Sequence, residues 1–241
     1  MDSFFNPQLA VDAMSTLLLG LLVTVGLTIA CGITSLIVGI FVALARMSRF
    51  RLLRLVVSGY VQLMRSTPLL IQLIYIYFAL PFIGIRLDPF VAAYVALTLN
   101  VSAYLAEVYR SGIEAVPRGQ RDAAAALGMR PGVIMARIIL PQGIRIVIPA
   151  LGNYMVSLFK DTSLAAVITV QELLFRGQIF AARTYDYFTI YTLVFVLYFA
   201  VGYPAIRLVM LLEKKVKRGY AQRRPLIITP TGDVEILEGS K

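Results

Sequence analysis

The sequence predicts an all-α integral membrane protein with five transmembrane helices. Of its 241 residues, 59% are hydrophobic and 15% are charged, and the mean hydropathy is +0.80. A soluble core of this length could not bury so much apolar surface. A membrane-crossing helix needs about 20 apolar residues, and apolar runs of suitable length cover residues 17–45, 67–83, 90–108, 143–159 and 187–212.

The first run follows a short segment that holds Asp2 and Asp12 in place of a basic stretch. Because the run also continues without a small-residue cleavage site, we expect no removable signal peptide and treat residues 1–13 as an external N-terminal segment. Cys31 is the single cysteine, and histidine is absent. The composition therefore offers no material for a disulfide, a zinc site or a histidine proton relay, and we expect no metal site.

Residues 50–64 mix arginines with leucines and valines, a pattern typical of a helix that lies at the membrane interface. Pro68 follows directly before the second apolar run. Proline lacks a backbone N–H and clashes with the preceding turn, so the second helix is expected to begin or bend there, and a helix start is the simpler interpretation.

Basic residues gather after the first, third and fifth runs, in segments 46–54, 110–137 and 214–224. The other connections hold few, chiefly Arg86, Arg176 and Arg183. The positive-inside rule then predicts an external N-terminus and a cytoplasmic C-terminus for a multi-pass membrane protein. Topology also explains the net charge of +10 better than nucleic-acid binding does. Residues 14–218 form the predicted membrane domain, and 219–241 form a cytoplasmic tail expected to lack regular structure.

A polar, alanine-rich island interrupts the apolar chain at 119–142, inside a connection that spans about 111–141. A small-residue helix is expected over 122–127, with Pro117 in its first turn region, a left-handed stop at Gly128 and a restart at Pro131. A thin helix of small residues lets another protein approach closely. An ordinary loop helix is the alternative.

The spacing within this island favours docking. Asp122, Ala123 and Ala124 are followed by Gly128 and then by Ile138, Leu140 and Pro141. This resembles the E-A-A, three residues, G, nine residues, I-x-L-P signature of permeases of ATP-binding-cassette (ABC) importers, with aspartate in place of glutamate. Further segments resemble the polar amino acid permease subfamily in order, at 65–70, 102–107, 119–120, 141–142 and 160–164. The resemblance covers roughly 14–217.

The resemblance implies an ABC importer type I permease core in the cytoplasmic (inner) membrane of a prokaryote, whose loop enters a groove on a separate cytoplasmic ATPase. It also implies two ATPase copies, an external solute-binding protein, and a dimer with an identical or related permease chain. The chain has no G-x-x-x-x-G-K-[ST] sequence, so ATP and Mg²⁺ are expected on the ATPase and no cofactor on this chain. The expected coupling residues are Gly119, Arg121, Asp122, Ala123, Ala124, Gly128, Pro131, Leu140 and Pro141.

Polar groups in the later spans are candidates for the substrate pathway. Asn153, Ser157 and Lys160 share one helical face, and Lys160 lies about 28 Å along the helix from Pro141. Residues 162–175 are too few for a crossing and suggest a re-entrant helix after a break at Thr162 and Ser163. Backbone groups and hydroxyls at such a break suit a carboxylate, and Asp161 or Glu172 suits an ammonium group.

Several of these charges also have local explanations. Lys160 and Asp161 could neutralise each other at a helix end, Glu107 could pair with Arg110 three residues on, and Glu172 could pair with Arg176 four residues on. The aromatic residues Tyr185, Tyr187, Phe188 and Tyr191 fit an interface belt.

Two functions remain open from the sequence. The first is the membrane subunit of an ATP-driven importer of amino acids or similar small zwitterions, which works by alternating access and is itself no enzyme. The alternative is an ion-coupled transporter or channel that uses Glu107, Asp161 and Glu172 as its ion path, although no internal repeat is evident. A membrane-bound enzyme ranks last because neither a metal cluster nor a nucleophile–histidine pair is available.

Overall fold

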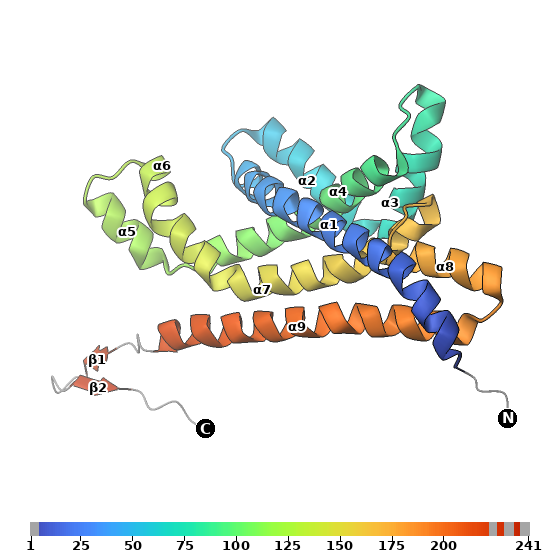
Figure 1. Ribbon diagram of the computed structural model, residues 1–241. Helices are drawn as coiled ribbons and strands as arrows, with labels where there is room; N and C mark the ends of the chain where they lie inside the picture. The colour runs from blue at the N-terminus through green and yellow to red at the C-terminus, as the bar shows by residue number, and fades with distance from the viewer. Residues whose placement is uncertain (1–4, 222–225, 229–233, 237–241) are drawn as a thin grey trace.

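The computed structural model describes residues 5–221, 226–228 and 234–236. Nearly all of this part of the chain is helical (Figure 1). Four of its helices are long and apolar enough to cross a membrane, and one bent helix pair raises the number to as many as five. The predicted helical membrane protein is therefore confirmed, with the fifth crossing formed only if the bent pair is one span.

Helix α1 (Pro7–Arg46) has 40 residues, which at 1.5 Å per residue gives a length of roughly 60 Å. It begins ahead of the predicted first run because Asn6 caps it, accepting hydrogen bonds from the backbone N–H groups of Gln8 and Leu9. The predicted external segment 1–13 thus includes the first turns of α1, and its residues 1–4 lie outside the described part. The helix is about twice as long as a hydrocarbon core is thick.

The second predicted run follows a sharp bend. Helix α2 (Arg51–Ser66) ends before Pro68, and α3 (Leu69–Ile74) begins directly after it. Thr67 is extended, as expected for a residue before proline, and the chain is bent by 108° between the two arms. The expected helix start at Pro68 is confirmed. The second arm continues through a π turn (Tyr75–Ala79) and a 3₁₀ turn (Leu80–Ile83).

Helix α4 (Pro89–Glu114) is capped by Asp88, whose carboxylate accepts a hydrogen bond from the N–H of Phe90. It packs between α1 and α7 (Figure 1). Where α4 crosses the helix containing Gly143, a Cβ atom on Gly112 would lie 2.6 Å from the Gly143 carbonyl oxygen. The two backbones can approach this closely only because both positions lack side chains.

The fourth run is longer than predicted. Helix α6 (Pro131–Ile134), a π turn (Met135–Ile139), α7 (Leu140–Asp161) and a 3₁₀ segment (Thr162–Ile168) form one continuous helical span, Pro131–Ile168. The span thus begins at the expected restart, Pro131, inside the connection predicted over about 111–141. The wider π turn precedes Pro141, which has no N–H to offer the turn before it.

The remaining helices are α5 (Arg118–Ala126), α8 (Leu173–Thr184) and α9 (Tyr187–Ala221). Helix α9 lies along α7, and its C-terminal end reaches the end of the molecule that carries α5 and α6 (Figure 1). Strands β1 (Leu226–Ile228) and β2 (Val234–Ile236) pair antiparallel, with Leu226 opposite Ile236. The tail therefore has more regular structure than predicted; its residues 222–225, 229–233 and 237–241 lie outside the described part.

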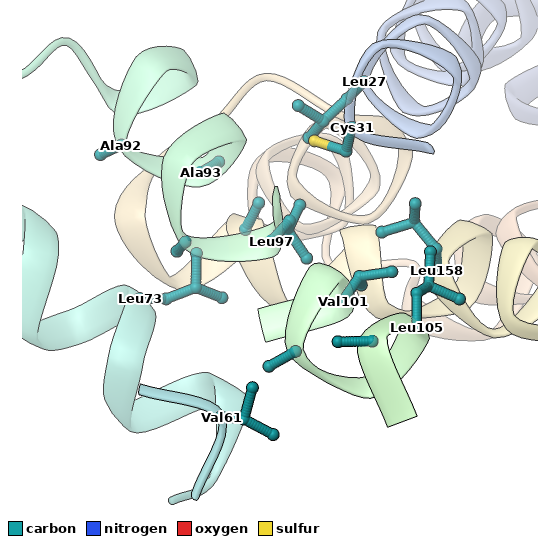
Figure 2. Packing of buried hydrophobic residues seen from close by; sticks show 14 of the residues in the cluster. Leu27, Cys31, Val61, Leu73, Ala92, Ala93, Leu97, Val101, Leu105 and Leu158 are labelled. Carbon is teal, nitrogen blue, oxygen red and sulfur yellow. The ribbon is translucent and has the colours of Figure 1, made fainter. Parts of the chain in front are cut away.

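The main core lies where α1, α3, α4 and α7 meet. Leu27 and Cys31 of α1, Leu73 of α3, Leu97 and Leu105 of α4, and Leu158 of α7 are buried there (Figure 2). Many of the other core positions on α4 are alanine, so neighbouring helices approach closely and gain van der Waals contacts. This packing fixes α7, which carries the candidate pathway residues, against α4, which leads to α5.

Candidate functional site

The alanine-rich island forms a compact helix–turn–helix at one end of the molecule (Figure 1). Helix α5 begins at Arg118, directly after Pro117, rather than at the predicted residue 122. The chain reverses at Gly128, whose φ of +74° lies in the left-handed region, and α6 restarts at Pro131. The expected stop and restart are confirmed, because glycine supplies the left-handed residue and proline suits a first helical position.

The inner face of this unit rests on a small hydrophobic cluster. Its buried members are Ile113, Val116, Ala124, Ile134 and Ile139. Ala124 was expected to take part in coupling, but its side chain is only 3% exposed and packs inward. It therefore holds α5 against the ends of α4 and α6 and presents no surface to a partner.

The outer face of α5 is exposed. Arg121, Asp122 and Ala123 lie on it, as expected for residues that a partner would contact. The sequence analysis missed Leu127, whose side chain is 82% exposed at the tip of α5. A large apolar residue directly before the glycine stop was the signal that could have identified it. Gly119, Pro131 and Pro141 are also exposed, and Leu140 is half-buried.

The polar face of α7 lies away from the core. Asn153 and Lys160 are exposed and Ser157 is half-buried, so the expected common face is confirmed. Asp161 follows at the end of α7, half-buried. Lys160 and Asp161 do not lie within ion-pair distance of each other, although the charge of Lys160 acts on the Asp161 carboxylate. That the two charges neutralise each other at the helix end therefore stays a prediction.

The predicted break after α7 is instead a tightening of the helix. The hydroxyl of Thr162 donates to the carbonyl oxygen of Phe159 at 2.7 Å, and that of Ser163 donates to Lys160 at the same distance. Both hydroxyls thus bind to the preceding turn as the chain enters the 3₁₀ segment. Thr162 is fully buried and Ser163 is half-buried, which leaves Lys160, Asp161 and Ser163 as the accessible polar groups.

A cavity of roughly 450 Å³ opens beside this face, between α7, α8 and α9. Lys160 and Ser163 supply its polar groups from the α7 side. Most of its lining is apolar or aromatic, including Tyr191, Tyr198 and Tyr203 of α9. The expected belt residues Tyr185, Tyr187, Phe188 and Tyr191 are exposed at the start of α9.

Glu172 does not join the α7 face. Its side chain is fully buried and caps α8, accepting a hydrogen bond of 2.7 Å from the N–H of Phe175. The hydroxyl of Tyr198 donates to the same carboxylate at 2.8 Å, and Thr24 lies 3.4 Å from it. The predicted pair with Arg176 is wrong, because that guanidinium donates to the carbonyl oxygen of Gln171 instead.

Glu107 pairs with Arg110 at 2.9 Å, which confirms that expectation. It also binds Arg46 and, at 3.2 Å, Arg65. Because Glu107 is held by guanidinium groups and Glu172 by neighbouring groups on α1, α8 and α9, neither offers a free ligand to a passing ion. The ion path proposed for the alternative function is therefore not assembled.

Comparison with known proteins gives a consistent result. The sequence model of the family described as "Binding-protein-dependent transport system inner membrane component" matches residues 35–218. The chain is 40% identical to the probable amino-acid ABC transporter permease protein YckA of Bacillus subtilis (strain 168), over 89% of this chain and 95% of that protein. It is 46% identical to the L-cystine transport system permease protein TcyB of the same organism, over 69% and 71% of the two chains.

Solved structures share the fold. A crystal structure of an amino acid ABC transporter with histidines matches with a TM-score of 0.81 and 36% identity, covering 85% of this chain and 96% of that one. An inward-facing structure of the MetNI methionine ABC transporter matches with a TM-score of 0.63. At 21% identity, the second likeness concerns the fold alone.

Proposed function

Because the chain belongs to the family of binding-protein-dependent transport inner membrane components, as the permease subunit of an ABC importer, we propose that its cargo is amino acids or similar small zwitterions. ATP hydrolysis in this family is the task of a separate ATPase subunit. The names of the relatives support the cargo class, since they describe permeases for amino acids, cystine and glutamine. The observation that carries the proposal is the exposed α7 face, which presents an ammonium group and a carboxylate side by side at Lys160 and Asp161.

The two opposite charges of this face are complementary to the two charges of a zwitterion. The ammonium group of Lys160 would bind the substrate carboxylate, and Asp161 would bind the substrate ammonium group. Because the two side chains are not paired with each other, neither has to give up an ion pair to take a ligand. Asn153, Ser157 and Ser163 would add neutral hydrogen bonds. Thr162 and Glu172 are buried and would support the shape of the region without contacting the substrate.

The orientation that we propose has an external N-terminus and a cytoplasmic C-terminus. The concentration of arginine and lysine after the first, third and fifth runs supports it. The arrangement of the helices is compatible with it, because α5, α6 and the C-terminal end of α9 lie at one end of the molecule and the N-terminal end of α1 at the other (Figure 1).

The α5–α6 unit is the proposed ATPase contact. Exposed Arg121, Asp122, Ala123 and Leu127 form a narrow polar ridge with one apolar tip, of a size that a groove on a partner can enclose. Since α6 runs without a break into α7, a push on this unit would tilt the helix that carries Lys160. This is a direct route from ATP-driven closure to alternating access.

The full assembly would contain two ATPase copies, which bind the ATP and Mg²⁺, together with a second permease chain and an external solute-binding protein. A pathway between two permeases requires the polar α7 faces to be turned toward the partner chain. Their exposure in a single chain supports this arrangement. The second permease would be either identical or related in sequence.

Reconstitution tests this function directly. The chain would be placed in liposomes with a candidate ATPase and binding protein from the same genome, and uptake of a radiolabelled amino acid mixture would be followed. We expect uptake only with ATP, the ATPase and the binding protein present. Uptake by the chain alone under an ion gradient would support the ion-coupled alternative and refute the importer.

A further inference from the structure

One carboxylate joins three separate segments at the α5 end of the membrane domain. Glu107 on α4 binds Arg46, the last residue of α1, and Arg65, close to the end of α2. It also binds Arg110, one turn further along α4. We call these four residues the Glu107 hub. Arg46 and Arg65 belong to other helices than Glu107 and are distant from it in the sequence.

The two carboxylate oxygens face different neighbours. Oε1 binds Arg46 and Arg65, which belong to α1 and α2. Oε2 binds Arg110 of α4 itself, and Arg110 continues to Glu114 at 2.7 Å. A small rotation of Glu107 would therefore shift its hydrogen bonding between α2 on one side and the end of α4 on the other.

Each end of this chain of contacts meets a part that is expected to move. Glu114 is the last residue of α4, and with Arg118 and Arg121 of α5 it lines a hollow of roughly 430 Å³. Arg65 lies just before the bend at Thr67 and Pro68 that separates α2 from α3. The hub thus lies between the proposed ATPase contact and the bend.

A branch of the same contacts leads toward the α7 face. The guanidinium of Arg65 lies 5.6 Å from the centre of the Tyr104 ring, which is within cation–π distance. Tyr104 in turn lies 6.0 Å from the ring of Tyr154 on α7. Tyr154 is adjacent to Asn153, the first residue of the polar face. These ring contacts therefore connect Arg65 to the proposed substrate region.

The surroundings of the hub allow movement. It borders a cavity of roughly 540 Å³ that is also lined by Ser58, Gln62 and Ser66. The Glu107 side chain keeps 18% of its surface exposed and that of Arg65 keeps 43%. Close packing of α4 against α1 and α7 is provided elsewhere, by small residues such as Gly112 and the core alanines. The ion pairs can therefore rearrange without opening the core.

We propose that Glu107 is a positioning residue that couples movement of the α5–α6 unit to the angle between α2 and α3. The hub carries three guanidinium groups and one carboxylate, with Glu114 as the second acid on Arg110. When the α5 end of α4 shifts, Arg110 and Arg65 compete for Glu107, and the angle between α2 and α3 changes. Without the carboxylate, the arginines of α1, α2 and α4 repel one another, and α2 no longer follows α4. The inference rests on ATPase docking at α5.

Spin labels across the bend test this coupling. Leu55 on α2 and Phe82 at the end of the second arm are both exposed. In a Cys31→Ser background, the substitutions Leu55→Cys and Phe82→Cys would carry the two labels. Their separation is measured in the ATPase complex without nucleotide and after trapping with ATP, Mg²⁺ and vanadate. We expect the separation to change on trapping in the otherwise unaltered chain. We expect that change to disappear in Glu107→Gln and to return at least in part in Glu107→Asp.

Two further variants separate coupling from folding. Arg65→Gln removes a half-exposed partner and should also abolish the change, so it decides the matter if Glu107→Gln does not assemble. Asp12→Asn removes an exposed carboxylate on α1, far along the helix from Arg46, and should leave the change intact. If the label separation changes fully on trapping in assembled Glu107→Gln or Arg65→Gln, the coupling role is overturned. It is also overturned if the unaltered chain binds the ATPase but its label separation does not change on trapping. Failure of the unaltered chain to bind the ATPase would instead refute docking at α5.

Discussion

Replacing Gly128 by valine should weaken ATPase binding without preventing membrane insertion. Gly128 has a φ of +74°, and a Cβ atom built there would meet nothing within 4 Å. The substitution therefore introduces no collision, and its cost comes from the backbone alone. The left-handed conformation costs a residue with a Cβ atom roughly 1–2 kcal/mol. Since about 1.4 kcal/mol corresponds to a tenfold change in affinity, the dissociation constant should rise about 5- to 30-fold.

Gly132 offers a matched control in the same unit. It is exposed on α6, a Cβ atom there would also meet nothing within 4 Å, and its φ is not in the left-handed region. Gly132→Val should leave binding close to that of the parent. Gly128→Asn should lie between the two, because asparagine visits the left-handed region more readily than valine.

The assay is a titration of the ATPase onto the permease in lipid nanodiscs, with insertion checked by yield and by size-exclusion chromatography. Equal affinities for Gly128→Val and Gly132→Val would refute the reasoning, because the backbone turn at Gly128 would then contribute nothing to docking. Loss of insertion in Gly128→Val alone would also contradict it, since the α5–α6 unit would then be needed for the fold itself.

Three other changes have clear expected outcomes. Leu127→Ser should weaken ATPase binding at least about fivefold in the same titration, because it removes the exposed apolar tip of α5; unchanged affinity would exclude the tip from the contact. Gly112→Ala should lower the thermal unfolding temperature of the purified chain, by an overpacking cost of roughly 1–3 kcal/mol, whereas Gly26→Ala, which has open space, should not. Asp161→Asn should reduce ATP-driven uptake about tenfold by removing a charge-assisted hydrogen bond, with co-purification of the ATPase preserved; normal uptake would make Asp161 a helix-end charge only.

The sequence was sufficient to predict features that depend on local chemistry. Apolar runs identified the helices, and the bend at Pro68 and the reversal at Gly128 followed from the conformations that proline and glycine impose. The pair of Glu107 with Arg110 followed from their spacing on one helix. The shared face of Asn153, Ser157 and Lys160 followed from helical periodicity in the same way.

Features that depend on contacts between distant segments were not predictable. Arg46 and Arg65 reach Glu107 from other helices, and nothing in their local sequence marks them as its partners. Glu172 could be matched with Arg176 by spacing, but burial against Thr24 and Tyr198 determined its bonds. Ala124 was assigned to a partner surface because α5 is rich in small residues, and only the packing of Ile113 and Ile134 shows that it faces inward.

The π turn at Met135–Ile139 holds one residue more than an α turn without changing the direction in which the later residues of the span face. Deleting one residue from an α-helix rotates all later residues by about 100° around the helix axis. Deleting one residue from Met135–Ile139 would instead close this turn to an α turn and leave Lys160 facing nearly the same way relative to α5. The orientation of the polar α7 face relative to the ATPase contact therefore tolerates a change of length in these five residues that it would not tolerate within α7.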